Sequence, residues 1–547
     1  MKNKIIRDSV HGYISIPEPI VDKLIDTEFF QRLRRIEQTS MRPLFPCARH
    51  DRFIHSIGVY YLGGKVFDSV KSNFQKNKES LFDVNDAHQK DLLTKMMCDF
   101  SFWDDLRINF IIACLLHDVG HSPMSHTLED QFKVKQYSGS TNEFKGMPQF
   151  WEELESGMNN CMIDNCRQKV VDFFKSGIPA PHEVLSSIIV VKELRDNIKE
   201  AIYECCEKCA PDYEFIIRCI MGVPYTISQN DDKWFNDSLK NAFISLLHGT
   251  VFDVDRLDYL KRDSLASGMD SSSIDVERLI NAISLYFKNN FFGIAINKSA
   301  LSVIDEHIGA YNDLYLWVYS HHKVVLLTGL TRRAFEHIDK NSMSNSYYIS
   351  NIFNYKSLTL NLLSDDDIWC EIKKQKCGIW EAAELITRGN SLISMWKSVA
   401  EFRDLFGNLG AFLEDEKGVV PIKTIYSQIN STFEKNFTKM LFEKYNLDYS
   451  DSCAQDVIFE KTKIKEMSRK KWTIPIIIDN HLKLFSELMN VNHSAPKTIE
   501  KEREKERDSL NEICFYAYIK KDSKLNSIKK EDFARLLIEF VGLKKVD

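Results

Sequence analysis

Helix-breaking residues are scarce in this chain. Its 547 residues include only 21 glycines and 13 prolines, which is about half of the share that average usage would supply. Long hydrophobic runs are missing as well, and none approaches the roughly 20 residues that span a bilayer. The sequence therefore predicts a mainly α-helical protein without a membrane-spanning segment.

A strong excess of one charge is also lacking. The net charge of −6 is small for this length, so we expect neither broad nucleic-acid binding nor a membrane partner. The first residues, MKNKIIRDSVHGY, lack the apolar core of a signal peptide. The 13 cysteines are scattered and odd in number, as in proteins whose thiols stay reduced. These features together predict a cytoplasmic protein.

One stretch, FIIACLLHDVGHSPMSH (110–126), is chemically dense. Its apolar run, 110–116, predicts a buried helix that ends at His117 and Asp118. Three histidines and one carboxylate within ten residues are costly to bury without partners. Imidazole and carboxylate together are ligands that suit a transition metal. Adjacent helical residues point about 100° apart, so His117 and Asp118 are placed to hold an ion beside the helix. A second His-Asp pair, His50-Asp51, is assigned no ligand role.

The rest of the chain shows helical periodicity with a few exceptions. Residues 4–17 alternate in hydrophobicity and predict a short N-terminal β-hairpin. The composition near 69–100 and 133–150 is typical of flexible, solvated insertions. A Ser- and Asn-rich stretch that begins at residue 340 is the best candidate for a boundary. We therefore expect one domain at 1–339 and a helical region of unknown role at 340–547.

Seven segments of the first domain resemble, in order, the HD-domain metal-dependent phosphohydrolases, and within them the deoxynucleoside triphosphate (dNTP) triphosphohydrolases. These segments are DSVHGYI (8–14), DTEFFQRLRRIEQ (26–38), RHDRFIHSIGV (49–59), LLHDVGHSPMSH (115–126), HE (182–183), DVDRLDYLKRDS (253–264) and YSHHK (319–323). The resemblance implies an HD-domain helical bundle at 1–339. It also implies hydrolysis of a dNTP to deoxynucleoside and inorganic triphosphate.

The resemblance implies a metal site. Its ligands correspond to His55, His117, Asp118 and Asp255. Two imidazoles and two carboxylates suit one transition metal ion, without distinguishing Fe, Mn, Zn and Co. A second ion, Mg²⁺, is an option at the phosphates. Any one of these residues would also fit an ordinary helix end, and it is the four in register that favour a metal site.

Four further residues correspond to catalytic positions, namely His121, His126, Glu129 and His182. By resemblance, His126 protonates the leaving nucleoside oxygen, and Glu129 is spaced to orient its imidazole. His121 and His182 correspond to residues that contact the phosphates. The alternative for each histidine is a helix cap or a core position.

The substrate contacts implied by the resemblance are Gln38, Arg52, Arg256, Tyr259, Asp263 and Tyr319. Arginine suits phosphate because its fork donates hydrogen bonds in pairs. Tyr259 and Tyr319 correspond to tyrosines that exclude a 2′-hydroxyl, with ordinary aromatic packing as the alternative. Gln38 corresponds to a glutamine that contacts the sugar 3′-hydroxyl. An arginine expected shortly before Tyr319 is absent, and Tyr311-Asn312-Asp313 occupies that region.

An activating nucleotide and a homo-oligomer are implied as well. The residues that correspond to the activator site are Asp26, Gln31, Arg34 and Lys323. The neighbouring arginines 32, 34 and 35 would repel one another unless a polyphosphate lay among them. The alternative for Asp26 is a helix N-cap.

Two other functions stay open from the sequence. One is an HD phosphodiesterase or nucleotidase that acts on another nucleotide, which the missing arginine favours. The other is a nucleotide-sensing protein whose metal site is idle, against which the intact ligand set argues.

Overall fold

The architecture is mainly helical, as predicted, and comes from a computed structural model. It describes residues 2–76, 87–129, 148–159, 179–227, 233–269, 274–341, 362–414, 419–468, 471–479, 481–488, 510 and 512–542. The symbol η marks a 3₁₀- or π-helix. Up to residue 205 the elements are β1 (Asn3–Asp8), β2 (Gly12–Pro17), α1 (Glu18–Ile20), η1 (Val21–Ile25), α2 (Glu28–Gln31), η2 (Arg32–Arg35), α3 (Arg52–Lys76), α4 (Ala87–Cys98), α5 (Phe100–Leu116), η3 (Ser125–Thr127), α7 (Pro148–Asn159), α9 (Pro181–Lys192) and α10 (Arg195–Cys205).

The remaining elements fall before and after residue 342. Those before it are α11 (Tyr213–Met221), α12 (Lys233–Leu247), α13 (Val254–Ser267), α14 (Val276–Asn281), β3 (Ile283–Lys288), β4 (Phe291–Asn297), η4 (Lys298–Ala300), α15 (Leu301–Asp313), η5 (Leu314–Tyr319) and α16 (His322–Asn341). Those after it are α18 (Asp365–Lys374), α19 (Trp380–Ile386), β5 (Leu392–Ser394), α20 (Val399–Asn408), α21 (Pro421–Gln428), α22 (Ser431–Lys444), η6 (Asp451–Cys453), β6 (Val457–Lys463), β7 (Ile476–Ile478), β8 (His481–Lys483), α23 (Phe485–Leu488), β9 (Ile513–Lys520) and α25 (Lys530–Phe540).

The N-terminal hairpin is confirmed. Strands β1 and β2 pair antiparallel, with Asp8 opposite Gly12. Gly12 has a φ of +78°, a conformation that glycine adopts without steric cost. The hairpin therefore turns where the sequence predicted it.

The described part of the predicted flexible insertion near 69–100 is helical. Helix α3 continues to Lys76, and α4 follows at Ala87–Cys98. Val70 and Phe74 of α3 are fully buried, so the polar residues around them cover one face of a packed helix. The predicted insertion near 133–150 lies almost entirely outside the described residues.

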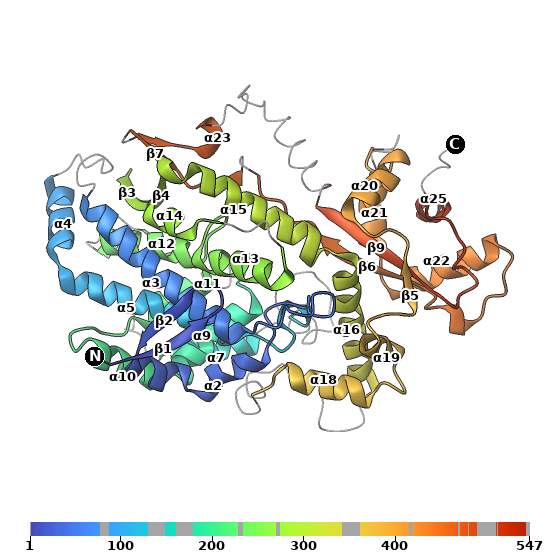
Figure 1. Ribbon diagram of the computed structural model, residues 1–547, viewed down its shortest axis with the longest axis horizontal. Coiled ribbons are helices and arrows are strands. Elements are labelled where there is room, and N and C mark those ends of the chain that lie inside the picture. The colour runs from blue at the N-terminus through green and yellow to red at the C-terminus, as the bar shows by residue number, and fades with distance from the viewer. Residues whose placement is uncertain are drawn as a thin grey trace.

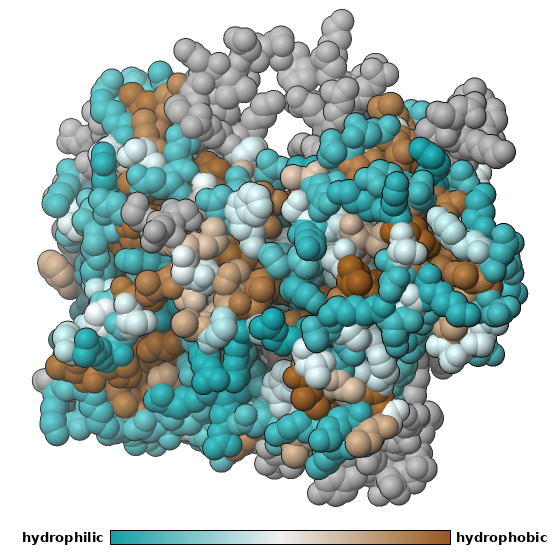
Figure 2. Space-filling view, turned by 45° about the vertical axis from the view of Figure 1, so that its right-hand side comes forward, coloured by the Kyte–Doolittle hydropathy of each residue, from teal (hydrophilic) through white to brown (hydrophobic). Residues whose placement is uncertain are grey.

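The buried side chains form two main hydrophobic cores. The first is built around α3, α5, α9, α11 and α12, and the second around α16, α20, α22, β6 and β9. Figure 1 shows α16 standing between the helices of the first core and the sheet of the second. One face of the surface is mainly hydrophilic, with hydrophobic residues in separate patches (Figure 2). No helix among the described residues is long and apolar enough to cross a membrane.

The C-terminal region contains strands that the sequence did not reveal. Its sheet has the order β5-β9-β6, and the six central residues of β9, ICFYAYIK, are all buried. A strand covered on both faces lacks the alternation that marks a half-exposed strand. The tyrosine hydroxyls of β9 reach the start of α16: Tyr516 donates to Ser320 O over 2.8 Å and Tyr518 to His322 O over 2.6 Å.

The C-terminal region also contributes to the first core. Strand β7 pairs in parallel with β4 and brings Ile476 opposite Ile296. Trp472 and Phe485 are buried in the same core. The division of the chain at residue 340 stays a prediction.

One pair of cysteines departs from the expectation of reduced thiols. Cys206 and Cys209, which follow α10, form a disulfide with Cα atoms 5.3 Å apart. The chain leaves the helix at Cys206, which is extended, and then turns, since Cys209 N donates to Cys206 O over 2.9 Å.

An ion cluster joins three elements of the second core. Arg333 of α16 donates to both carboxylate oxygens of Glu434 over 2.8 and 2.6 Å, and to Glu460 over 2.7 Å. Both glutamates are buried. Gly329 makes room, because a Cβ there would lie 2.0 Å from the Glu460 carboxyl carbon. The cluster therefore fixes α22 and β6 against α16.

Loss of this central cation is expected to destabilise the protein. Arg333→Met leaves two buried carboxylates without their partner, which should lower the free energy of unfolding by about 3 kcal/mol. The control is Arg332→Met, whose guanidinium is one-third exposed and 3.5 Å from Glu460, and which should cost less than about 1 kcal/mol. Denaturant titration followed by circular dichroism measures both. Equal losses would show that the cluster is not what stabilises this contact.

Candidate active site

Four residues predicted as metal ligands converge. His55 lies in α3, His117 caps the C-terminus of α5 with Asp118 after it, and Asp255 is in the first turn of α13. Asp255 Oδ1 is 3.0 Å from His55 Nε2 and 3.9 Å from His117 Nε2. Asp118 Oδ2 is 3.8 and 3.7 Å from the same two nitrogens. His55, His117 and Asp255 thus offer ligand atoms within 4.8 Å of one another, and Asp118, paired with Arg52, lies beside them.

Hydrogen bonds occupy the Nδ1 atom of each of the two imidazoles, so that each Nε2 atom faces the carboxylates. His55 Nδ1 donates to Asp258 Oδ2 over 2.7 Å, and His117 Nδ1 donates to Cys114 O over 2.9 Å. Both acceptors lack a proton, so each Nδ1 carries the hydrogen. Both Nε2 atoms are buried: His55 Nε2 faces Asp255 Oδ1 at 3.0 Å, and His117 Nε2 has no hydrogen-bond partner among the described residues. Metal-binding histidines are held in the same way, with the second ring nitrogen donating to a carboxylate or a carbonyl, so the residues present fit a transition metal ion.

The electrostatic potential between the four predicted metal ligands favours the binding of a cation. Burial lowers the pKa of His55, but the carboxylates of Asp255 and Asp258 outweigh it and raise the pKa to about 10. Burial alone would raise the pKa of Asp118, but Arg52 and the neighbouring histidines hold it well below its usual value. The carboxylates are therefore ionised and attract positive charge.

Close packing of α13 on α3 places Asp258 behind His55. A Cβ on Gly58, one turn after His55, would lie 2.0 Å from Asp258 Oδ1. Only glycine allows this approach without a shift. Asp253 caps α13 by accepting from Arg256 N over 2.6 Å, which starts the helix in the register that presents Asp255 and Asp258 on the metal side.

Asp258 was not identified from the sequence, although it is the centre of a buried network. His11 Nε2 donates to its Oδ1 over 2.7 Å, and Arg262 Nε donates to its Oδ2 over 2.7 Å. Arg262 also makes two hydrogen bonds, of 3.0 and 2.7 Å, to Asp8. The turn of the N-terminal hairpin is thereby joined to His55, one of the predicted metal ligands. The i,i+4 spacing of Asp258 and Arg262 was the available signal.

The three predicted catalytic histidines lie together beside Glu129. His121 stacks on His182 with ring centroids 4.4 Å apart, and His126 lies edge-on to both. Glu129 Oε2 accepts from His126 Nδ1 over 2.8 Å, and its Oε1 accepts from His182 Nδ1 over 2.6 Å. One carboxylate therefore orients two imidazoles.

Two of these histidines differ in charge. Burial lowers the pKa of His182, but the Glu129 carboxylate outweighs it and raises the pKa to about 9. Burial and the Arg52 guanidinium hold the pKa of His121 well below its usual value. A neutral His121 thus stacks on a cationic His182, which offers positive charge to an anionic ligand.

The turn that carries these residues packs tightly. A Cβ on Gly120 would lie 2.2 Å from Ser186 N in α9. Arg32 donates to His121 O over 2.7 Å and to Val119 O over 3.1 Å. It also donates to Leu363 O over 2.8 Å. Arg32 is buried here, whereas Arg34 and Arg35 are exposed, so Arg32 does not share a polyphosphate site with them.

A cavity of about 370 Å³ adjoins the metal-ligand cluster. Its lining includes the predicted substrate residues Gln38, Arg52, Tyr259, Asp263 and Tyr319, together with His126. Arg52 joins the cavity to the cluster, because it forms an ion pair with Asp118 and donates to Ser125 Oγ over 2.9 Å.

The tyrosine side of the cavity is held by Asp263. This buried carboxylate accepts from Tyr319 OH and, over 2.6 Å, from His50 Nε2. His50 had been given no role in the sequence. Arg256 is outside the cavity lining but lies 3.4 Å from Tyr259 OH, and its Nη1 is buried without a hydrogen-bond partner.

The residues predicted to bind an activator fall into two places. Arg34 Nε donates to Gln31 Oε1 over 2.8 Å, and its guanidinium lies 3.4 Å from the centre of the Phe53 ring. Asp26 is in the same segment, 4.0 Å from Lys4 Nζ. Lys323, in contrast, donates to Gly389 O in the C-terminal region over 3.1 Å.

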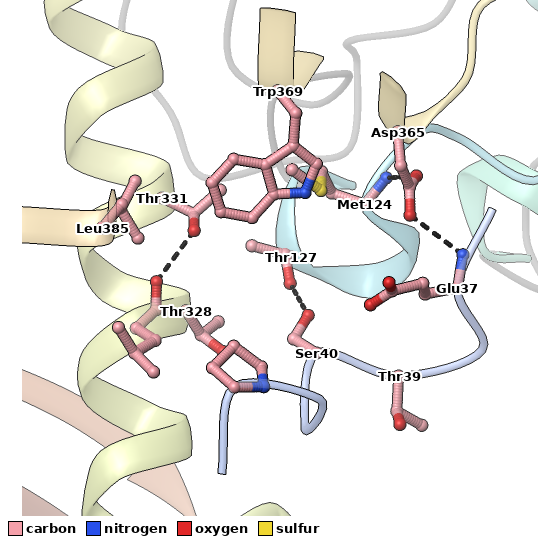
Figure 3. A pocket seen from close by; sticks show the side chains of 12 residues that line it. Glu37, Thr39, Ser40, Met124, Thr127, Thr328, Thr331, Asp365, Trp369 and Leu385 are labelled. Carbon is pink, nitrogen blue, oxygen red and sulfur yellow. Dashed lines mark hydrogen bonds between the residues drawn. The ribbon is translucent and has the colours of Figure 1, made fainter. Parts of the chain in front are cut away.

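A smaller cavity between the catalytic loops and α18 shows how the C-terminal region holds the site (Figure 3). Asp365 Oδ2 accepts from Glu37 N over 2.9 Å, and its Oδ1 accepts from Met124 N over 2.6 Å. One carboxylate therefore joins the loop before Gln38 to the turn before His126.

Comparisons with known proteins agree with this geometry. No protein-family model matches the chain. Over 165 residues it is 38% identical to the deoxynucleoside triphosphate triphosphohydrolase SAMHD1 homologue of Dictyostelium discoideum, covering 30% of this chain and 26% of that protein. Over 436 residues it is 24% identical to SAMHD1 of Gallus gallus, covering 76% of this chain and 58% of that protein. The chain is thus related in sequence to SAMHD1 and shares the His and Asp pattern of HD-domain phosphohydrolases.

The fold has a solved counterpart. A phosphohydrolase from Bacteroides thetaiotaomicron superposes with a TM-score of 0.53 at 19% identity, over 95% of this chain and 100% of that one. At that identity the likeness concerns the fold alone. The chain spans between a quarter and three fifths of the length of the curated relatives it matches.

The Asp258 network predicts a measurable effect on metal affinity. In Asp258→Asn the hydrogen bond that orients His55 weakens and loses its charge, so metal affinity should fall roughly 10- to 100-fold. Competition with a chelator, read by metal analysis after gel filtration, gives the affinity. Asp532→Asn, an exposed position in α25, is the control, and circular dichroism checks the fold. A folded Asp258→Asn protein that binds metal like the wild type would contradict the role given to Asp258.

Proposed function

We propose that this protein hydrolyses deoxynucleoside triphosphates to deoxynucleoside and inorganic triphosphate. The observation that carries the proposal is that His55 Nε2 and His117 Nε2 both lie within 4 Å of the Asp118 and Asp255 carboxylates, at distances of 3.0 to 3.9 Å. This arrangement lies beside a cavity of about 370 Å³ lined by tyrosines and charged residues. The relatives named as triphosphohydrolases support the same reaction.

Different residues serve different steps of hydrolysis at the α-phosphorus. A transition metal ion held by His55, His117, Asp118 and Asp255 would activate water by lowering its pKa. His182, kept cationic by Glu129, stabilises negative charge on the phosphoryl oxygens. His126 lines the cavity with its Nδ1 bound to Glu129, which leaves Nε2 to give a proton to the leaving 5′-oxygen.

The preference for a deoxyribose rests on the tyrosine side of the cavity. Tyr319 is fixed through its hydroxyl by Asp263, and Tyr259 lines the same cavity. Rings held in this way leave little freedom to accept an added 2′-hydroxyl. Among the described residues Gln38 Oε1, which is buried, has no hydrogen-bond partner, so it is available to accept from the 3′-hydroxyl.

The first test removes one proposed ligand. Asp118→Ala should lose bound metal and lower the turnover of dATP by more than about 100-fold. Products are identified by chromatography as deoxyadenosine and inorganic triphosphate, with ATP run in parallel as a poorer substrate. Asp532→Ala is the control. Full activity of Asp118→Ala would refute the metal assignment, and release of pyrophosphate or single phosphates would favour a different nucleotide hydrolase.

We further propose that a nucleotide binds at Asp26, Gln31 and Arg34 and promotes assembly of a homo-oligomer. The three side chains occupy one short segment, and the Arg34 guanidinium is exposed above Phe53. A guanidinium fork in this position suits a phosphate. Binding that favours the oligomer over the monomer stabilises it by mass action.

Activation should therefore depend on Arg34. The wild type is expected to show sigmoidal rates and an increase in mass by light scattering when a second dNTP is added, and all four should be tried. Arg34→Ala should lower this response about tenfold, because it removes a charged hydrogen bond. Arg278→Ala, an exposed arginine of α14, is the control. A wild type that stays monomeric and fully active with one substrate would exclude this mechanism.

A further inference from the structure

A segment of the C-terminal region lies along the catalytic cavity. Residues 464–468 follow β6, and Lys465 from this segment lines the same cavity as Arg52, Tyr259 and Tyr319. The seven segments that carry the resemblance to dNTP triphosphohydrolases end at residue 323, so they assign nothing to this lysine.

The backbone on both sides of Lys465 is anchored. Ile464 N donates to Glu512 O over 2.9 Å, and the Ile464 side chain is buried in the second core. On the other side, Met467 N donates to Asn312 Oδ1 over 2.8 Å, and Asn312 Nδ2 donates to Met467 O over 2.9 Å. The Met467 side chain is buried in the first core. The position of Lys465 is therefore set by both cores.

The Lys465 side chain itself is exposed and uncommitted. Its Nζ lies 5.3 Å from the centre of the Tyr315 ring, and Tyr315 also lines the cavity. The structure shows no ion pair between Lys465 and any carboxylate of the described residues. The ammonium group is thus free to bind an anion in the cavity.

The cavity lining has few positive charges with which to bind a triphosphate. A triphosphate carries several negative charges at neutral pH. Arg52, the other lysine or arginine of the lining, is already paired with Asp118. Lys465 is therefore the permanent positive charge of the lining that no described carboxylate neutralises.

Two neighbouring tyrosine rings, Tyr311 and Tyr315, lie between Arg256 and Lys465. The Arg256 guanidinium lies 5.7 Å from the Tyr311 ring centre, and the Tyr311 and Tyr315 rings are 4.4 Å apart. Arg256 follows the metal ligand Asp255 directly. Two cations, Arg256 and Lys465, thus flank one tyrosine pair.

We propose that Lys465 binds the terminal phosphates of the substrate, so that the C-terminal region supplies part of the substrate site. This inference rests on the proposed function, since it takes the substrate to be a triphosphate. A compact ammonium on a flexible stem suits a phosphate group, which it can meet as a point charge.

The test measures binding apart from turnover. Inorganic triphosphate is titrated into the metal-loaded protein by calorimetry, and deoxyadenosine is titrated separately. Lys465→Ala should weaken triphosphate binding about tenfold, the effect expected from losing one charged hydrogen bond. Lys465→Arg should restore most of it, and deoxyadenosine affinity should not change. Lys463→Ala, an exposed position at the end of β6, is the matched control.

The outcomes separate this inference from the proposed function. If dNTPs are hydrolysed and the KM of Lys465→Ala equals that of the wild type, the inference is wrong and the function stands. If deoxyadenosine binding weakens instead of triphosphate binding, Lys465 contacts the base or sugar and the inference is again wrong. If triphosphate binding depends on Lys465 but no dNTP is hydrolysed, the inference stands and the proposed function falls.

Discussion

The hydrogen bond between His55 Nδ1 and the Asp258 carboxylate is the contact on which the catalytic half depends. Asp258 is fully buried, and a buried carboxylate is stable only when its oxygens have partners. Arg262 and His11 supply those partners, and Arg262 extends the network to Asp8. The packing of α13 on α3, the docking of the hairpin and the orientation of a metal ligand are therefore consequences of a single buried charge.

The C-terminal region contributes more to the candidate active site than its sequence indicates, since that sequence carries no recognised catalytic motif. Asp365 holds the two loops that carry Gln38 and His126. The tyrosines of β9 hold the carbonyls just beyond Tyr319. These contacts are hydrogen bonds to backbone atoms, which depend on the position of the main chain and very little on the identity of the residue bound. Through these hydrogen bonds, residues of both cores position the side chains that line the cavity.

Much of the metal centre could be predicted from the sequence. His117 and Asp118 follow an apolar helix, a place where unpaired polar groups are costly, and the resemblance supplied His55 and Asp255. The hairpin was predicted for a similar local reason, since Gly12 allows the turn. Arg32, in contrast, was grouped with Arg34 and Arg35 as a cluster that a polyphosphate would relieve, whereas it donates to three buried carbonyls. A local pattern does not say which arginine of a cluster turns inward.

The sequence by itself determined the helical class, the hairpin and the types of ligand, because each depends on residues that are neighbours in the chain. Only the tertiary structure revealed the contacts of Asp258 and His50 and the place of Lys465 at the cavity. Asp258 is separated from His55 by 203 positions, and His50 from Asp263 by 213. Such contacts arise when helices pack, and Gly58 illustrates the reason: a missing side chain on one helix admits a carboxylate from another. The spacing of residues along the chain therefore does not predict the close approach of these two helices.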